Sequence, residues 1–189
     1  MHEKQNAKFV SFAGYSMPIQ YKGINFEHNH VRRSVGVFDV SHMAQIHIKG
    51  NYAFNLVQRI TTNDIGKLTP GKVQYSCMLN QKGGIVDDLL VYCLKKDFYM
   101  LVVNASNANK DYNWICANNV DNVEIIDVTK NHGLLAVQGP GSYDLLQKLT
   151  NVNLQSIPYY SFKIDVFADC KDVIISNTGY TGASGFELY

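Results

Sequence analysis

The chain has 189 residues, enough for one large domain or two small ones. Its hydrophobic share of 46%, charged share of 17% and net charge of +1 are typical of a globular protein with a hydrophobic core. It has no block rich in Lys and Arg and no apolar run of membrane-spanning length, so neither nucleic-acid binding nor membrane binding is indicated.

The first 43 residues predict short elements. Lys8 to Phe12 alternates as a strand, and the run Ala-Gly-Tyr-Ser-Met-Pro at 13–18 is expected to break any regular element. A short helix is predicted from Asn25 to Ser34, because Gly36 follows as a stop. The compact run at 37–43 mixes polar and large apolar residues, which fits either the core or the wall of a pocket.

Residues 44–130 alternate between strand and helix patterns. Ala44 to Gly50 predicts a half-buried strand with His47 on its solvent side. Asn51 is expected to cap the next helix, and Ser106 a later one. The order strand, helix, three hairpin-linked strands, helix, strand predicts a ferredoxin-like α+β domain with one additional strand.

Residues 131–189 predict a return to β-rich structure, which together with 1–43 would form a second, incomplete domain. A strand at 134–137 precedes a helix that follows Gly139-Pro140-Gly141, and strands are expected near 160–166 and 173–176. A glycine-rich loop then enters an apolar strand in which the sequence stops. We therefore expect a fragment of a longer protein, with exposed core surface, self-association and no activity of its own.

Two adjacent carboxylates interrupt the apolar run that follows the Gly83-Gly84 turn. Asp is disfavoured in strands and costly to bury without a partner, so Asp87 and Asp88 require an explanation. Side chains alternate across a strand, and Asp88 therefore shares a face with Tyr92 while Asp87 points the other way. We expect one carboxylate to face a site and the other to cap the turn or meet solvent. The alternative is that both are structural turn residues.

The cysteines and histidines show no metal-binding spacing. The four Cys include no Cys-x-x-Cys pair, and the six His include no His-Glu-x-x-His motif, so we expect no metal site. Cys77 and Cys93 lie in apolar, strand-like runs, where reduced and buried cysteine is usual. A reducing compartment is expected, either the cytoplasm or, in a eukaryote, the mitochondrial matrix.

Five motifs, each weak alone, occur in the same order as in the aminomethyltransferase, or T-protein, of the glycine cleavage system. The resemblance covers nearly the whole chain, and full-length members are roughly twice as long, with a C-terminal barrel-like domain that is absent here. The motifs are Phe-Ala-Gly-Tyr-Ser-Met-Pro at 12–18, Val-Phe-Asp-Val-Ser-His-Met at 37–43, Gly-Gly-Ile-Val-Asp-Asp-Leu at 83–89, Gln-Gly-Pro at 138–140 and Gly-Tyr-Thr-Gly at 179–182.

The resemblance implies a one-carbon transferase of glycine catabolism. The methylene of an aminomethyl group on the lipoyl arm of the H-protein would pass to tetrahydrofolate, the co-substrate, with release of ammonia. Such a reaction requires proton transfer near the folate nitrogens and a site shielded from water, and it requires no metal. The fold implied is α+β, with antiparallel sheets, flanking helices and the ferredoxin-like segment 44–130 inserted in a β-rich folate-binding domain at 1–43 and 131–189.

The resemblance also implies the site residues. Asp88 matches the key carboxylate near the reacting folate nitrogens, and the shared strand face of Tyr92 supports Asp88 over Asp87. Glu187 would accept hydrogen bonds from the pterin amino group and ring N–H. One departure is Ala183, where the family often carries an acid. The implied folate-binding residues are Met43, Tyr92, Asn104, Tyr159, Tyr180 and Glu187.

Three alternatives stay open at this point. The chain could be a related folate-binding domain that uses another methylated donor, an amine or a sulfur compound. It could be a non-catalytic folate-binding factor of iron–sulfur assembly, although the Lys-Gly-Cys motif of such proteins has no match here. A non-catalytic interaction module is the third alternative, and the interrupting acids and the glycine-rich loop disfavour it.

Overall fold

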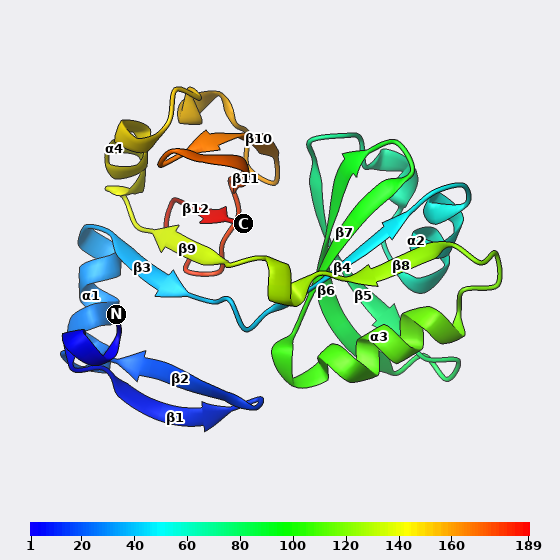
Figure 1. Cartoon of the computed structure of the whole chain (residues 1–189), viewed down its shortest axis with the longest axis horizontal. Helices are drawn as coiled ribbons and strands as arrows, with labels where there is room; N and C mark the ends of the chain where they lie inside the picture. Colours follow the sequence, from blue (N-terminus) through cyan, green and yellow to red (C-terminus); the bar gives the residue numbers. More distant parts are fainter. The chain divides into compact units, whose positions relative to one another are not determined.

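The computed structural model describes residues 1–189 and divides into two compact units (Figure 1). Unit 1 comprises Met1–Val40, Leu134–Tyr159 and Lys163–Tyr189, and unit 2 comprises Ser41–Gly133 and Tyr160–Phe162. The sequence predicts a division at 43/44 and 130/131. The assignment of folate binding to the domain at 1–43 and 131–189 stays a prediction.

Unit 2 is built on a five-stranded antiparallel sheet with the order β5-β6-β7-β4-β8. Strands β8, β4, β7 and β6 with the two helices have the ferredoxin-like order, and β5 is the additional strand at one edge. The predicted α+β fold class, with antiparallel sheets and flanking helices, is confirmed. The elements are β4 (Ala44–Lys49), α2 (Ala53–Ile60), β5 (Val73–Leu79), β6 (Ile85–Lys95), β7 (Phe98–Val103), α3 (Ala108–Ala117) and β8 (Glu124–Asp127).

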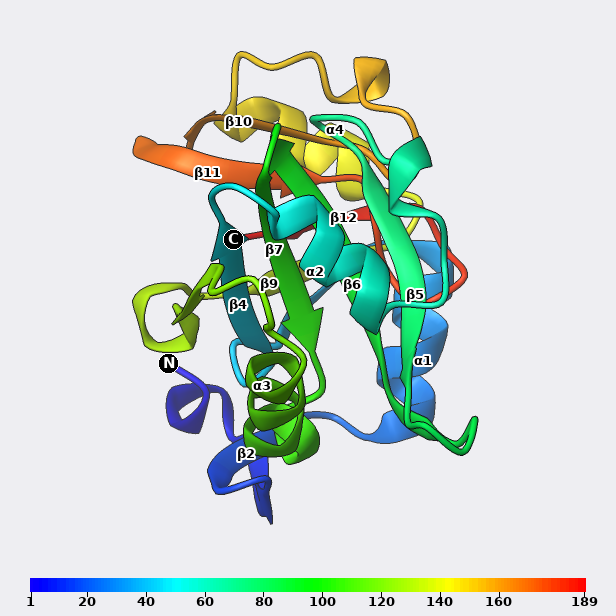
Figure 2. The same cartoon turned by 90° about the vertical axis from the view of Figure 1, so that its right-hand side faces the viewer.

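Helices α2 and α3 lie over one face of this sheet (Figure 2). Alternate strand residues point to that face, so Leu89 and Val91 of β6 pack in one core with Leu56 of α2 and Ile115 of α3. All four are at most 2% exposed. Full burial of such a side chain stabilises the fold by roughly 1.5–3 kcal/mol, so this core fixes the strand register that positions the two carboxylates.

Unit 1 contains a second five-stranded sheet with the order β10-β11-β12-β9-β3, in which β12 is the central strand. Its core gathers Val137, Leu146, Ile175 and Phe186 under the short helix α4. The elements are β1 (Lys8–Phe12), β2 (Tyr15–Gln20), α1 (Ile24–Arg33), β3 (Gly36–Asp39), β9 (Leu135–Gln138), α4 (Ser142–Leu146), β10 (Phe162–Phe167), β11 (Cys170–Ser176) and β12 (Gly185–Leu188).

The prediction that residues 13–18 break regular structure is wrong. They belong to a β-hairpin, because β2 pairs antiparallel with β1 around a turn at Ala13 and Gly14, both with positive φ. Pro18 is tolerated because the sheet has only two strands, so its missing N–H costs no central ladder bond.

Three smaller predictions in unit 2 are also wrong. Helix α2 begins after Tyr52, which has a positive φ of 68° and no side-chain cap, so Asn51 does not cap it. Ser106 lies inside a 3₁₀ turn at Ala105–Asn107 rather than at the cap of α3. His47 is half-buried, with Phe98 of the neighbouring strand and His132 edge-on to its ring at centroid distances of 4.9 and 5.9 Å.

None of the helices combines the length and the apolar character that crossing a membrane requires.

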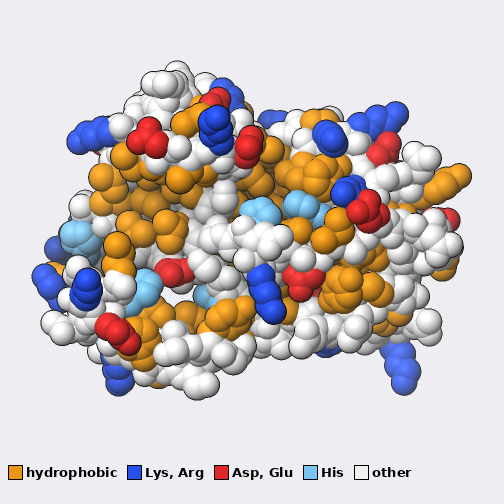
Figure 3. Space-filling view, viewed as in Figure 1, with side chains coloured by type: hydrophobic (Ala, Val, Ile, Leu, Met, Phe, Trp, Pro, Cys, Tyr) orange, Lys and Arg blue, Asp and Glu red, His pale blue; other side chains and the backbone are white.

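On the face shown in Figure 3, cationic and anionic side chains are interspersed. All four cysteines are free thiols, and Cys93 is buried in the core of unit 2.

Candidate active site

Strand β6 reaches the candidate site through a tight turn and a β-bulge. The Asn80 side-chain oxygen accepts the N–H groups of Lys82 and Gly84 at 2.9 and 3.0 Å. Next, Leu79 faces Ile85 while Met78 faces Asp87, which leaves Val86 as the extra residue. A bulge increases the local twist of its strand, so this one sets the direction in which the following carboxylates leave the sheet.

Asp88 is held through both carboxylate oxygens by uncharged donors. The Tyr75 hydroxyl donates to Oδ2 at 2.8 Å, and the Asn104 amide donates to Oδ1 at 2.9 Å. Tyr75 comes from β5, and Asn104 follows β7, so the strands on both sides of β6 contribute. The side chain is fixed without neutralisation of its charge, which suits a group that accepts a proton or stabilises a cation.

Asp87 neither caps the turn nor meets solvent, so that expectation is wrong. It is 6% exposed, and its Oδ1 accepts hydrogen bonds from Asn104 and Asn107, both at 3.0 Å. The predicted alternation holds, because Leu89 and Val91 on the Asp87 face lie in the helix-covered core. The Asn104 amide nevertheless reaches both acids, because it lies at the strand end beside Asp88.

Hydrogen bonding and burial shift the pKa values of this cluster. The hydrogen bond to Asp88 raises the pKa of Tyr75 to about 12, so its hydroxyl stays a donor. Burial by itself would raise the pKa of Asp87, but the neighbouring Asp111 side chain and the hydrogen bonds from the Asn104 and Asn107 amides bring it below the usual value. Burial first, and the neighbouring Asp87 second, raise the pKa of Asp111 to about 8.

The other predicted residues of unit 2 are less closely linked to Asp88. Tyr92 lies on the predicted strand face, is 0% exposed and packs against Phe162 with ring centroids 5.4 Å apart. Met43 is partly buried just before β4, and its carbonyl accepts a hydrogen bond from Gln45 at 3.3 Å. Their roles in folate binding stay predictions.

Glu187 lies in unit 1 on the central strand β12. It is 6% exposed, which excludes a solvent-facing strand carboxylate. The Thr178 hydroxyl donates to Glu187 Oε2 and lies 3.0 Å from the Ser176 hydroxyl. Burial raises the pKa of Glu187, and the Thr178 hydrogen bond opposes that rise.

Gln138 fixes the glycine-rich loop that leads into β12. Its amide donates to the carbonyls of Thr178 and Phe186 at 3.1 and 3.3 Å, and its oxygen accepts from the Thr181 hydroxyl at 2.9 Å. The side chain is 1% exposed, and Gly179 and Gly185 leave the space that it occupies. The loop shape therefore depends on an interior amide.

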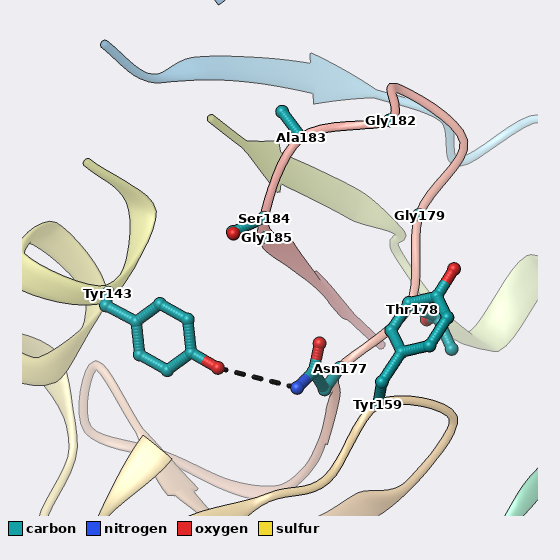
Figure 4. Close-up of a pocket in the computed structure, with 9 residues that line it drawn as sticks. All are labelled: Tyr143, Tyr159, Asn177, Thr178, Gly179, Gly182, Ala183, Ser184 and Gly185. Atoms are coloured by element: carbon teal, nitrogen blue, oxygen red, sulfur yellow. Dashed lines mark hydrogen bonds between the residues drawn. The ribbon is translucent and has the colours of Figure 1, made fainter. Parts of the chain in front are cut away.

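The loop borders a pocket of about 370 Å³ within unit 1 (Figure 4). Tyr159 and Tyr143 flank it, and the Asn177 amide donates to the Tyr143 hydroxyl at 3.4 Å. Tyr180 is the next loop residue after Gly179 and, like Tyr159, is 67% exposed. Neither the predicted role of Tyr159 nor that of Tyr180 is tested by these positions. The pocket is lined by Tyr143, Tyr159, Asn177, Thr178, Gly179, Gly182, Ala183, Ser184 and Gly185.

Several residues around the acids do not emerge from the sequence reasoning. Asp88 pairs directly with Cys77, and Tyr75 lies diagonally across the hairpin from Asp88. This register cannot be read from the sequence, because the bulge shifts it by one residue. Asp111 carried one usable signal, because it lies four residues before the core residue Ile115 and so on the apolar face of α3. Asn107 gave none, and Gln138 enters the sequence analysis only as the first residue of the Gln-Gly-Pro motif at 138–140.

The comparisons with known proteins identify the family of the chain. The family model described as "GCVT N-terminal domain" matches residues 1–189. The aminomethyltransferase of Flavobacterium psychrophilum is 53% identical over 189 residues, which are 100% of this chain and 52% of that protein. That of Bacteroides fragilis is 54% identical over 188 residues, with the same shares. The chain thus spans about half the length of the curated relatives it matches.

Solved structures show the same fold. The glycine cleavage system aminomethyltransferase T from Bartonella henselae superposes with a TM-score of 0.88 at 34% identity, over 99% of this chain and 50% of that one. A heterotetrameric sarcosine oxidase from Corynebacterium matches with a TM-score of 0.60 at 15% identity, over 87% of this chain and 82% of that one, and shares the fold alone. With a family model matched over its whole length, the chain belongs to the GCVT N-terminal domain family.

Proposed function

We propose that this chain is the N-terminal part of a tetrahydrofolate-dependent aminomethyltransferase of the glycine cleavage system. The carbon–sulfur and carbon–nitrogen bonds of a lipoyl-bound aminomethyl group break, and its methylene forms new bonds to two folate nitrogens. The two protons that these nitrogens lose pass to the departing amine and thiolate, which leave as ammonia and the dihydrolipoyl carrier. The names of the relatives over the full chain support this reaction class. The proposed partner is the lipoylated H-protein, and the proposed compartment is the cytoplasm.

The observation that carries the proposal is the fixed, charged carboxylate of Asp88. Its two oxygens are held by Tyr75 and Asn104, neither of which cancels the charge. In the proposed reaction, Asp88 takes up a proton from a folate nitrogen and stabilises positive charge that develops as the aminomethyl group is released. A preorganised carboxylate needs no reorientation during that step.

Glu187 is the proposed anchor of the pterin. Its carboxylate suits two parallel N–H donors of a pterin ring, and Gln138 and Thr178 hold the loop and the strand around it. Met43, Tyr92, Tyr159 and Tyr180 complete the proposed folate site. Asn104 acts in it by orienting Asp88.

The test is ammonia release from aminomethylated H-protein in the presence of tetrahydrofolate. It is run on the chain alone and on the chain joined to the remaining half of the Flavobacterium psychrophilum relative, called here the completed enzyme. We expect turnover that requires both carrier and folate. Folate-dependent turnover only with a methylated amine or sulfur donor would instead support a related one-carbon transferase, and folate binding without turnover of any donor would contradict an enzyme.

A further inference from the structure

Asp111 is an acid in the interior of unit 2. It lies within α3, is 0% exposed and has Ile115 of the core one turn further along the helix. An ionised carboxylate there would need charged or hydrogen-bonding partners to offset the loss of water. The salt bridges of the structure do not include Asp111.

Three buried carboxyl oxygens of Asp111 and Asp87 lack a hydrogen-bond donor. Both Asp111 oxygens and Oδ2 of Asp87 are buried and receive no hydrogen bond from any N–H or hydroxyl group. Asp87 Oδ1, by contrast, accepts two amide hydrogen bonds. Each carboxyl group shifts the pKa of the other, so the two groups are neighbours. Two carboxylates cannot bond to each other, but a carboxylic acid and a carboxylate can, through one shared proton.

The surrounding charges assign the proton to Asp111. Asp87 keeps the negative charge because the Asn104 and Asn107 amides stabilise it. Asp88 adds a second negative charge that disfavours ionisation of Asp111. Lys110, the cation beside it, instead donates to the Val86 carbonyl. The groups that face Asp111 from β6, the Ala105–Asn107 turn and α3 are therefore two acids, amides and one cation bonded elsewhere.

We propose that Asp111 is a positioning residue, protonated at neutral pH, whose hydroxyl donates to Asp87 and thereby holds Asp88 through Asn104. The path is continuous: Asp111 to Asp87, Asp87 to the Asn104 amide, and that amide to Asp88 Oδ1. This inference rests on the proposed function only in taking Asp88 as the reacting carboxylate. The proton itself is a property of the folded chain.

The first measurement needs neither carrier nor folate. The infrared spectrum of the chain at neutral pH should contain the carbonyl stretch of a protonated carboxyl group, and this band should disappear as the pH is raised through about 8. Asp111→Asn should remove the band, and Asp169→Asn, on an exposed residue, should keep it. A wild-type spectrum without the band, or a band that persists in Asp111→Asn, overturns the proposal.

The unfolding temperature provides a second test with a definite sign. The raised pKa means that the folded chain keeps a proton that the unfolded chain has lost, so its stability falls as the pH rises from about 4 to about 8. Asp111→Asn cannot ionise. Its unfolding temperature relative to wild type should rise across that range and level off above it. A difference that does not change with pH contradicts a shared proton.

The positioning role is tested by two variants. Asp111→Ala removes the donor, and Asp111→Asn restores one in the form of an amide. We expect the Asn104 side-chain amide signals in NMR to shift in Asp111→Ala and to return towards wild type in Asp111→Asn. In the completed enzyme, kcat should fall on the order of 10²-fold in Asp111→Ala with little change in KM, and Asp111→Asn should recover most of it.

The outcomes separate the two proposals. Unmoved Asn104 signals, or an Asp111→Asn variant as impaired as Asp111→Ala, overturn the positioning role whatever the reaction is. A completed enzyme that releases no ammonia overturns the proposed function. The infrared band and the Asn104 signals then still decide the inference about Asp111.

Discussion

At the scale of single residues, the candidate site separates fixing a charge from cancelling it. Asp88 receives hydrogen bonds from the Tyr75 phenol and the Asn104 amide, and it forms no salt bridge. Paired with Arg or Lys, it would be a weaker base and a weaker partner for a developing cation. Neutral donors restrict its orientation and keep its charge available for the reaction.

Replacement of Asp88 by Asn should abolish most of that function while conserving the shape of the side chain. Turnover in the completed enzyme should fall about 10²–10⁴-fold, the range for a positioned acid or base, with a far smaller change in folate affinity. Asp169→Asn is the matched control, because Asp169 is exposed and its positive φ of 63° is one that Asn tolerates. Ammonia release at wild-type rate from Asp88→Asn would remove Asp88 from the mechanism.

Glu187→Gln should weaken tetrahydrofolate binding, because one acceptor oxygen becomes a donor that faces a donor. The loss of a charged hydrogen bond is worth about 1.5–3 kcal/mol, measurable by titration calorimetry. Since burial raises the pKa of Glu187, wild-type affinity should fall on acidification as the carboxylate takes up a proton, whereas the variant should lack this dependence. Glu124→Gln, on an exposed residue paired with Lys49, is the control. Equal affinity and equal pH dependence in Glu187→Gln and wild type would disprove the anchor.

At the scale of elements, the sequence predicts the strands from their residue pattern, and it misses the contacts that depend on how the strands pair. Period-two alternation places β4 and β5, whereas β6 and β7 are predicted as apolar runs, in keeping with the burial of both faces over most of their length. The cap expected at Asn51 fails because Tyr52, in the left-handed region, precedes α2, and the Ala53 N–H bonds to the Gly50 carbonyl at 3.0 Å. Tyr75 and Asn104 approach Asp88 only after a bulged register and a third strand are in place, and no local pattern encodes either.

The turn between β9 and α4 offers a test at this scale. Gly139 has a φ of +124°, and a Cβ there would overlap the carbonyl oxygens of Ser34 and Val31 at the end of α1. Gly139→Ala should therefore cost several kcal/mol of unfolding free energy, through backbone strain of roughly 1–3 kcal/mol plus the steric overlap. Gly14→Ala is the control, since its φ of +84° is also unfavourable but its surroundings are open, and it should cost about 1–2 kcal/mol. Urea unfolding of the two variants decides, and equal losses would contradict the packing argument.

At the scale of the whole molecule, the two compact units are interleaved along the chain, and unit 1 carries an exposed apolar hairpin. Every residue of β1 is exposed, and the hairpin that it forms with β2 has only two strands. Isolated hairpins are marginally stable in water, and contiguous exposed apolar side chains favour association. The exposed apolar residues of this hairpin are Phe9, Val10, Phe12, Tyr15 and Ile19.

We expect the 189-residue chain to self-associate through this hairpin. The double substitution Phe12→Thr and Ile19→Thr keeps β-forming residues but removes apolar area, and it should shift sedimentation velocity profiles towards the monomer. Ser11→Thr, in the same strand, is the matched control and should leave the profile unchanged. A wild-type chain that sediments as a monomer at all concentrations would contradict this expectation.

The extra residue at Val86 has a consequence for how this region tolerates change. If the turn is kept, deletion of one residue before the acids would move Asp88 into the place of Asp87, beside Asp111, and Leu89 into the place of Asp88, because strand faces alternate with every residue. Two-residue insertions in the loop at 80–84 would conserve the alternation. Homologous chains should therefore differ in this hairpin by even numbers of residues. An insertion or deletion of a single residue would move one acid, interior or reacting, into the place of the other.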